Sequence, residues 1–410
     1  MWTRLTSALL VAVLGTAVLS GAGQAGGGSP FAGEVAPAPT PAPVGSGQPA
    51  LAVDRSGRVW LSWLEAREGG GYRFRVASRR GSDWTEPVTI AEGDTLLANW
   101  ADVPAVFVSS TGALVASWLE RGPGRGAYGI RVRTSTDEGR NWTPAVTPHR
   151  DESRAEHGFV SFFDAPGTGP GLVWLDGREM AGGHGGTGNM ALRATTLTGG
   201  RPGDEMVVDP RVCECCQTSA ARIDGGVIVA YRDRSDDEVR DIAVSRFLNG
   251  AWSAPRTVHP DNWRINACPV NGPVVAAFGR AVAVAWFTMG GATDPYAKVA
   301  FSTDAGETFS PPAVVNVDAT LGRLGLAMFG DDRVLVSSVE RGGDGPHIVV
   351  REVRRNGRMR DAIRVAPSSL DRASGLPRLA VSGRDVVFAW TETRGADAPT
   401  QVRVAVARLK

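Results

Sequence analysis

A short phrase recurs along the chain at nearly constant spacing, and this repeat constrains the fold more than any other feature. In the first three copies an aromatic residue is followed by an apolar residue and an acid, as in Trp63-Leu64-Glu65, and the later copies keep parts of this pattern. Seven copies begin at Trp63, Trp118, Trp174, Tyr231, Trp286, Ser338 and Trp390, with separations of 55, 56, 57, 55, 52 and 52 residues. A repeat of this length, with several short strands in each unit, is typical of the blades of a β-propeller.

The rest of the sequence agrees with an all-β fold. The 410 residues include 52 glycines and 12 tryptophans. Apolar segments are short and bounded by turn residues, and no long helical periodicity is present. We therefore predict a β-propeller of four-stranded antiparallel blades over residues 48–410, with seven repeat units in which the phrase ends the second strand.

Two turns in the repeat carry a second motif. Between the third and fourth strands of two units, the chain matches the pattern Ser-x-Asp-x-Gly-x-x-aromatic. The matching residues are Ser135, Asp137, Gly139 and Trp142 in one unit, and Ser302, Asp304, Gly306 and Phe309 in the other. This pattern suits a tight turn, because Ser and Asp side chains bond to the backbone, Gly adopts a positive φ and the aromatic ring fills the blade.

With these turns, nearly all of the mature sequence resembles the sialidase-like (neuraminidase) Asp-box β-propeller superfamily. The resemblance implies that the Asp-boxes are structural and lie on the face opposite the active site. Sialidases have six blades, so a six-bladed closure stays open here, and a segment near Phe31 could close the ring as an outer strand. The sialidase catalytic set cannot be transferred to this chain, because no Arg-Ile-Pro motif stands near the start of the propeller and tyrosines are scarce.

The N-terminal region predicts export. Residues 1–25 have a basic start, an apolar run and small residues at a cleavage position, as in a secretory signal peptide. Residues 26–47 are rich in Pro, Ala and Gly and predict a flexible linker. We therefore expect a secreted or periplasmic monomer in an oxidising compartment, with no membrane span in the mature chain.

Charged residues concentrate in the loops that one face of a propeller should carry. The net charge is only +1, which gives no case for nucleic acid as a partner. The acids Asp102, Asp176 and Asp233 are candidate catalytic carboxylates, since glycoside hydrolysis uses two of them. Candidate groups for binding an acidic sugar or another small-molecule ligand are Arg178, Arg232, Arg234, Arg323, Arg378, Asn271 and His157. For the phrase acids Glu65, Glu120 and Glu392 we favour a structural role, in pairs with neighbouring arginines.

The four cysteines have three interpretations. Cys213, Cys215 and Cys216 follow one another closely, and Cys268 lies at the equivalent position of the next unit. Export favours disulfides, a soft-metal site for Zn or Cu(I) is the second interpretation, and a nucleophilic cysteine is the third. Apart from that metal, we expect no cofactor. The phrases C-x-C-C and A-C-P-V-N-G-P are similar to those of exported sialidase-like propellers of unassigned activity.

These observations leave three hypotheses about function. The chain is a hydrolase of acidic glycans, similar to an exo-sialidase. Alternatively, it is a non-catalytic propeller that binds glycan or protein through the same rim, or a propeller with a metal site at its cysteines.

Overall fold

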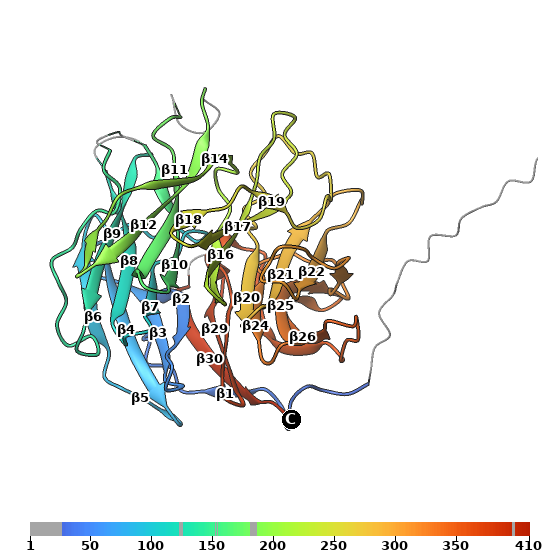
Figure 1. Cartoon of the computed structure of the whole chain (residues 1–410). Coiled ribbons are helices and arrows are strands. Elements are labelled where there is room, and N and C mark those ends of the chain that lie inside the picture. The colour runs from blue at the N-terminus through green and yellow to red at the C-terminus, as the bar shows by residue number, and fades with distance from the viewer. Residues whose placement is uncertain (1–26, 123–125, 152, 154, 181–186, 396–397) are drawn as a thin grey trace, which may run out of the picture.

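The chain forms an all-β propeller of seven blades, mostly four-stranded and antiparallel (Figure 1). The structure is a computed structural model, and it describes residues 27–122, 126–151, 153, 155–180, 187–395 and 398–410. The predicted signal peptide lies outside the described residues. The count of seven repeat units is therefore confirmed, and the six-bladed alternative is wrong.

The strands of the first four blades follow the order of the sequence. Blade one holds β2 (Ser46–Val53), β3 (Val59–Ala66), β4 (Tyr72–Arg80), β5 (Asp83–Trp84) and β6 (Val88–Gly93). Blade two holds β7 (Ala105–Val108), β8 (Leu114–Arg121) and β9 (Tyr128–Ser135). Blade three holds β10 (His157–Ala165), β11 (Gly169–Asp176), β12 (Met190–Thr198), β13 (Arg201–Pro202) and β14 (Met206–Val212). Blade four holds β15 (Ser219–Ile223), β16 (Gly226–Arg232), β17 (Ile242–Leu248), β18 (Ala251–Trp252) and β19 (Arg256–Thr257).

The last three blades close the ring. Blade five holds β20 (Val274–Phe278), β21 (Ala281–Thr288), β22 (Tyr296–Ser302) and β23 (Ala313–Val314). Blade six holds β24 (Gly325–Met328), β25 (Arg333–Gly342), β26 (Gly345–Arg354) and β27 (Ile363–Pro367). The short 3-10 helix η1 (Arg372–Ser374) precedes blade seven, which holds β28 (Arg378–Ser382), β29 (Asp385–Glu392), β30 (Gln401–Arg408) and the N-terminal strand β1 (Ala36–Ala38). In the described part of the chain, no helix is long and apolar enough to cross a membrane.

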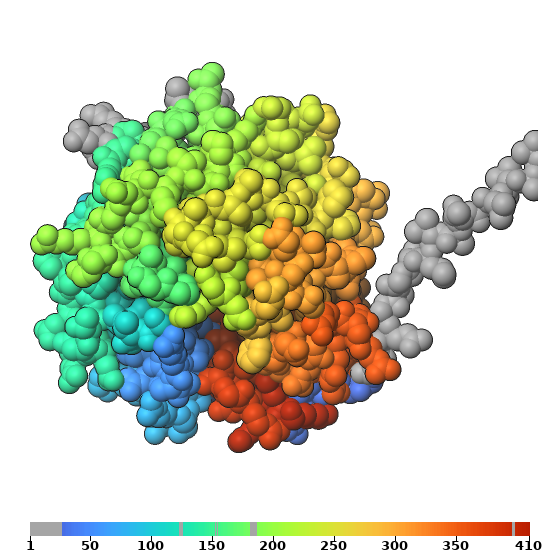
Figure 2. Space-filling model, viewed as in Figure 1, coloured from blue at the N-terminus to red at the C-terminus, as the bar shows by residue number. Residues whose placement is uncertain are grey.

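The N-terminal segment completes blade seven from outside. Strand β1 pairs antiparallel with β30, with Pro37 opposite Ala405, and Phe31 forms a bridge with Leu409. Phe31 is only 2% exposed and meets the ring of Phe388 edge-on. The described N-terminal segment therefore lies beside the C-terminal strand, where blue meets red at the lower edge of the molecule (Figure 2). The linker prediction for residues 26–47 is wrong over their described part, because apolar residues in it bury themselves against blade seven. The expected closure by an N-terminal strand occurs, five residues after Phe31.

The repeated phrase packs neighbouring blades together. The indoles of Trp63, Trp174 and Trp286 are fully buried. Trp63 lies in one apolar cluster with Val387 and Val402 of blade seven. The other two indoles likewise pack against the blade that precedes their own. Burying an aromatic ring of this size stabilises the fold by about 1.5–3 kcal/mol, so the spacing of the phrase reports the packing of blade on blade.

The inner strands of the blades line the axis of the ring. Strand β2 contacts β7 and β28, and β15 contacts β10 and β20. The chain enters each inner strand from the same side, so the loops that lead into the blades gather at one end of the axis. The turns between third and fourth strands lie at the other end, as the turn from β4 to β5 does at the lower edge of Figure 1.

Candidate functional site at the channel mouth

Hydrogen bonds tie the entry loops of several blades into a ring around the axis. Gln217, before blade four, donates from Nε2 to the carbonyl of Ala101 (2.8 Å). Its Oε1 accepts the backbone N–H of Gly272 (2.9 Å). Asn271 in turn accepts the N–H of Arg323 through Oδ1 (2.8 Å). Loops from blades two, four, five and six thus meet at one mouth, as the strand alternation predicted.

Two adjoining cavities open along the axis beneath these loops. Their volumes are about 360 and 170 Å³. Both are lined by Gln217, Thr218, Ser219 and Arg378, while Asp102 lines the larger cavity and Arg323 the smaller one. Asp102 is the only carboxylate among the described residues that line either cavity. The larger volume is that of a small-ligand pocket.

Two arginines bring uncompensated positive charge to these cavities. Arg378 donates from Nε to the carbonyl of Pro49 (3.1 Å), and burial lowers its pKa to about 10. Arg323 donates to Ser374 Oγ and to backbone carbonyls, and its guanidinium lies 5.6 Å from the ring centre of Trp100. Burial also lowers the pKa of Arg323. Neither arginine forms an ion pair within the described part of the chain, so the cavities favour an anionic ligand.

Asp102 is a titratable acid in the same place. Its side chain is buried, and Oδ2 accepts the N–H of Phe159 (2.7 Å). Burial raises the pKa of Asp102 to about 7; the hydrogen bond opposes this shift, and the charge of Glu156 adds to it. A Cβ on Gly158 would lie 2.0 Å from Asp102 Oδ2 and 3.0 Å from the Tyr128 ring, so only glycine permits this approach. Asp102 can therefore exchange a proton near neutral pH.

The cysteines form a buried cluster at the entry to blade four. The sulfurs of Cys213, Cys215 and Cys216 all lie within 4.8 Å of one another, and those of Cys213 and Cys216 are 3.2 Å apart. Cys268 is exposed on the next entry loop, and after Cys213 and Cys216 it is the third cysteine that raises the pKa of Cys215. The sequence therefore identified three residues that the fold brings together, with Cys268 on the neighbouring loop, and the chemical state of all four stays a prediction.

Guanidinium groups surround this cluster. Arg240 donates from Nη1 to Cys213 Sγ (3.3 Å). It also pairs with Glu214 (2.6 Å) and Glu238 (2.8 Å), and Arg234 pairs with the same two glutamates. Hydrogen bonds from the neighbouring thiols, with the charge of Arg232 in addition, hold the pKa of Cys213 well below its ordinary value.

Arg232 is enclosed differently from its neighbours. It is 2% exposed, and its donors reach only carbonyl oxygens, those of Asn271, Arg240 and Phe287. Its guanidinium lies 4.9 Å from the ring centre of Trp263. No carboxylate pairs with it among the described residues, and its neighbours are carbonyl dipoles, a π face and the nearby sulfurs.

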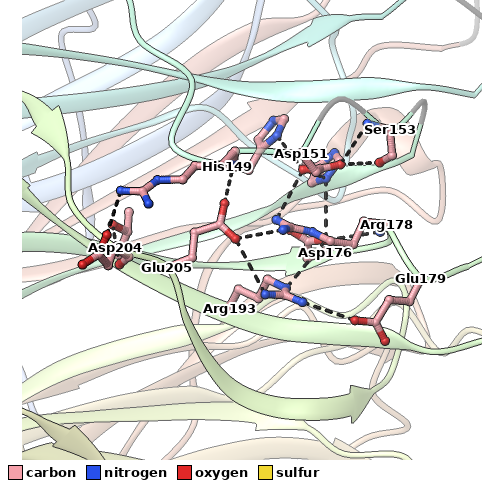
Figure 3. A network of polar contacts seen from close by, with 12 residues as sticks. His149, Asp151, Ser153, Asp176, Arg178, Glu179, Arg193, Asp204 and Glu205 are labelled. Atoms are coloured by element: carbon pink, nitrogen blue, oxygen red, sulfur yellow. Dashed lines mark hydrogen bonds and ion pairs between the residues drawn. The ribbon is translucent and has the colours of Figure 1, made fainter.

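A second polar cluster lies in blade three (Figure 3). Asp151 Oδ1 lies 3.1 Å from His149 Nδ1, 3.0 Å from His157 Nε2 and 3.3 Å from Arg178 Nη2. The two imidazoles are stacked, with centres 3.9 Å apart. Burial and the neighbouring imidazole lower the pKa of His149. Arg178 also donates two hydrogen bonds of 2.7 Å to Asp176. Its guanidinium group therefore lies between the carboxylates of Asp151 and Asp176.

Asp176 and Asp233 do not line the cavities. Asp176 is fully buried and accepts the indole N–H of Trp174 (2.8 Å) besides the bonds from Arg178. Those partners hold its pKa low despite the opposing effect of burial. Asp233 lies at the end of β16, where burial, with the charge of Asp209 second, raises its pKa to about 6. Of the three predicted catalytic acids, only Asp102 faces the channel.

The remaining phrase acids have structural partners. Glu65 accepts the indole N–H of Trp63 (2.8 Å) and lies 3.4 Å from Arg75. Glu120 accepts the indole of its own phrase in the same way, and Glu392 pairs with Arg403 (2.9 Å). These contacts are of the kind that we expected from the repeat.

Both Asp-box turns have one geometry. Ser135 Oγ accepts the N–H of Gly139 (2.9 Å) and donates to Asp137 (2.8 Å). Ser302, Gly306 and Asp304 repeat this arrangement. Both glycines have φ +84°, and the aromatic residues at the ends of the boxes pack beside the cores of their blades.

Sequence reasoning missed several residues of the site. Trp100, Tyr128, Gln217 and Arg240 all lie outside the repeated phrase. Gln217 follows the cysteines directly, and its position at an entry loop could have identified it. His149 and Asp151 belong to a long loop after β9, and no spacing in the sequence relates them to His157.

Comparison with known proteins supports the fold. No protein-family model matches the chain, and neither does any curated protein. Among solved structures, the polysaccharide lyase Uly1 is 10% identical with a TM-score of 0.54, over 89% of this chain and 90% of that one. An ulvan lyase bound to -[GlcA(1-4)Rha3S]- has the same identity and TM-score, over 88% of this chain and 93% of that one. NanB sialidase from Streptococcus pneumoniae is 12% identical with a TM-score of 0.46, covering 93% of this chain and 71% of that one.

At these identities the likeness concerns the fold alone. The fold itself combines antiparallel blades around an axis with two Asp-box turns. It departs from sialidases in having seven blades.

Proposed function

We propose that the chain binds an acidic glycan at the channel mouth and that Asp102 is the acid–base group for cleaving it. The observation that carries this proposal is the shared lining of one cavity by Asp102 and Arg378. A sugar carboxylate held by Arg378, with Arg323 at the adjoining cavity, would place the ring of that sugar next to Asp102. The two lyases with TM-scores of 0.54 support a polysaccharide as the ligand, and one of them holds a glucuronate unit.

The cavity favours elimination over hydrolysis. Hydrolysis of a glycosidic bond commonly needs two carboxylates about 5–10 Å apart, and the described lining supplies only Asp102. Elimination from a uronate needs a cation against the sugar carboxylate, a base for the adjacent carbon-bound proton and an acid for the leaving oxygen. Arg378 would supply the cation, and Asp102 with a pKa of about 7 would move the proton. Tyr128, beside Asp102, is a second group that could donate to the leaving oxygen.

Binding and turnover should be tested separately. Purified full chain would be titrated with uronate polymers, sialosides and neutral arabinan, with calorimetry for binding. Reducing ends and the ultraviolet absorbance of unsaturated uronates would report turnover. Arg378→Ala should weaken binding of acidic polymers about 10- to 100-fold, the effect of losing a charged hydrogen bond. Arg355→Ala is the control, since Arg355 is an exposed arginine in the turn after β26.

The outcomes separate the candidate functions. Asp102→Asn should abolish turnover while leaving the dissociation constant within a few-fold of wild type. Binding that depends on Arg378, without turnover of any polymer, would establish the non-catalytic alternative. If no acidic glycan binds, or if Arg355→Ala weakens binding as much as Arg378→Ala does, the proposal is wrong.

A further inference from the structure

The cysteine cluster has the size of a metal site. A tetrahedral ion with metal–sulfur bonds of about 2.3 Å holds its sulfurs roughly 3.8 Å apart. Three sulfurs that all lie within 4.8 Å of one another need only small side-chain movements to reach that geometry. Cys268 stands outside this group, on the neighbouring entry loop, where its thiol is close enough to raise the pKa of Cys215.

The side chains around the cluster carry one positive charge in excess, which favours an anionic group at the sulfurs. Arg234 and Arg240 are balanced by Glu214 and Glu238, which leaves Arg232 as a buried cation that no carboxylate of the described residues pairs with. Buried charges in proteins are normally compensated. Two disulfides, Cys213 with Cys216 and Cys215 with Cys268, would be neutral and would leave this cation unbalanced. A monovalent ion with two thiolates, or a divalent ion with three, carries one negative charge and balances it. A fourth thiolate from the exposed Cys268 would add a second negative charge at the solvent side of the site.

We infer that Cys213, Cys215 and Cys216 bind one thiophilic metal ion, Zn(II) or Cu(I), with Cys268 as the fourth ligand where the ion requires one. Each coordinating thiol releases its proton to solvent, and no electron is transferred. Three buried ligands come from one loop, whereas Cys268 is exposed, so the site can exchange its fourth ligand. Zn(II) prefers four ligands and Cu(I) is satisfied by two or three, so Cys268 distinguishes the two ions.

The test uses the full chain purified without chelator. Metal content is measured, and after reduction the protein is titrated anaerobically with Zn(II), Cu(I) and Co(II). We expect one ion per chain and, with Co(II), absorption from sulfur-to-cobalt charge transfer. Cys268→Ser should weaken Zn(II) binding strongly, because Zn(II) prefers four ligands. It should weaken Cu(I) binding only slightly, because two or three cysteines satisfy that ion. Circular dichroism checks that each variant folds.

Two further variants locate the site. Arg232→Leu gives blade four the residue that the phrase has in blades one to three. It should keep the fold but weaken metal binding about 10- to 100-fold, as loss of a supporting residue around a metal does. His149, Asp151 and His157 form the other group of side chains that could bind a metal ion. His149→Ala removes one of these ligands and should leave the number of metal ions bound per chain unchanged. These readouts use metal alone, so they are independent of the glycan proposal.

The inference fails on either of two results. One is native protein in which alkylation before reduction labels no cysteine, mass spectrometry shows two disulfides, and no metal is bound. The other is metal uptake that survives Cys213→Ser and Cys216→Ser together, or that is lost in His149→Ala.

Discussion

Replacing Asp102 by Asn tests the electrostatics of the channel mouth through stability alone. Asn keeps the size of the side chain and an oxygen that can accept the N–H of Phe159, whose bond to Asp102 measures 2.7 Å. It removes the charge. The two proteins should therefore differ in how their free energies of unfolding depend on pH, whatever constant offset the new amide introduces.

The magnitude follows from the raised pKa. In the folded chain burial raises the pKa of Asp102 to about 7, against 3.8 for an ordinary Asp. Between these values the folded state binds the proton more tightly than the unfolded state. The stabilisation from the protonated acid is therefore complete below about pH 4 and is lost as pH rises to about 7. Each pH unit is worth about 1.4 kcal/mol, which gives roughly 4 kcal/mol in total.

The assay is urea denaturation followed by tryptophan fluorescence, repeated from pH 4 to pH 9. Relative to wild type, Asp102→Asn should gain stability steadily between about pH 4 and pH 7, by roughly 4 kcal/mol, and then level off. Other titrating groups, such as Asp233, are present in both proteins and cancel in the difference. A difference that stays constant over this range would refute the argument that Asp102 is desolvated at the mouth.

Four other substitutions, the last two compared with each other, test the fold by the same assay. Phe31→Ala should cost about 3–5 kcal/mol, because the ring is buried in blade seven; a negligible cost would mean that the N-terminal segment does not close the ring. Trp63→Phe should cost about 1–3 kcal/mol, because Glu65 would lose its indole donor; an unchanged midpoint would contradict that role. Gly306→Ala should cost more than Gly139→Ala, although both glycines have φ +84°. A Cβ on Gly306 would meet a side chain at 2.3 Å, whereas the nearest atom at Gly139 is 3.4 Å away. Equal costs would show that only the backbone angle matters.

The repeat made the architecture predictable from sequence, because each copy of the phrase has the same physical task. Trp63 and Trp174 fill equivalent wedges between blades, so the number of copies gave the number of blades. The N-terminal segment was different. Its composition is that of a linker, and its order comes from Phe31 and β1 packing on blade seven. Composition does not reveal a surface that lies more than 350 residues away in the sequence.

The site was predictable only in part, for a related reason. Strand alternation places the entry loops at one mouth, and Asp102, Arg323, Arg378 and the cysteines meet there as a consequence. Alternation does not say which side chains on those loops face the axis. Asp176 accepts hydrogen bonds from Trp174 and Arg178 of its own blade. These local bonds hold its carboxylate away from the channel, and the sequence could not reveal them.

Blade four departs from the repeat at the middle residue of the phrase, and this departure changes the chemistry around it. The middle residue of the phrase is buried in most blades, and Leu64, Leu119 and Leu175 fill that position with apolar surface. In blade four the same position holds Arg232, which the fold buries as fully as it buries the leucines. A cation placed there by the backbone cannot reach water, so its surroundings must supply negative charge. The cysteines stand on the entry loop of the same blade, and Cys213 donates its backbone N–H to the carbonyl of Arg232 (3.0 Å). The arginine and the sulfurs are therefore best understood as one unit, and a change to either should alter the chemistry of the other.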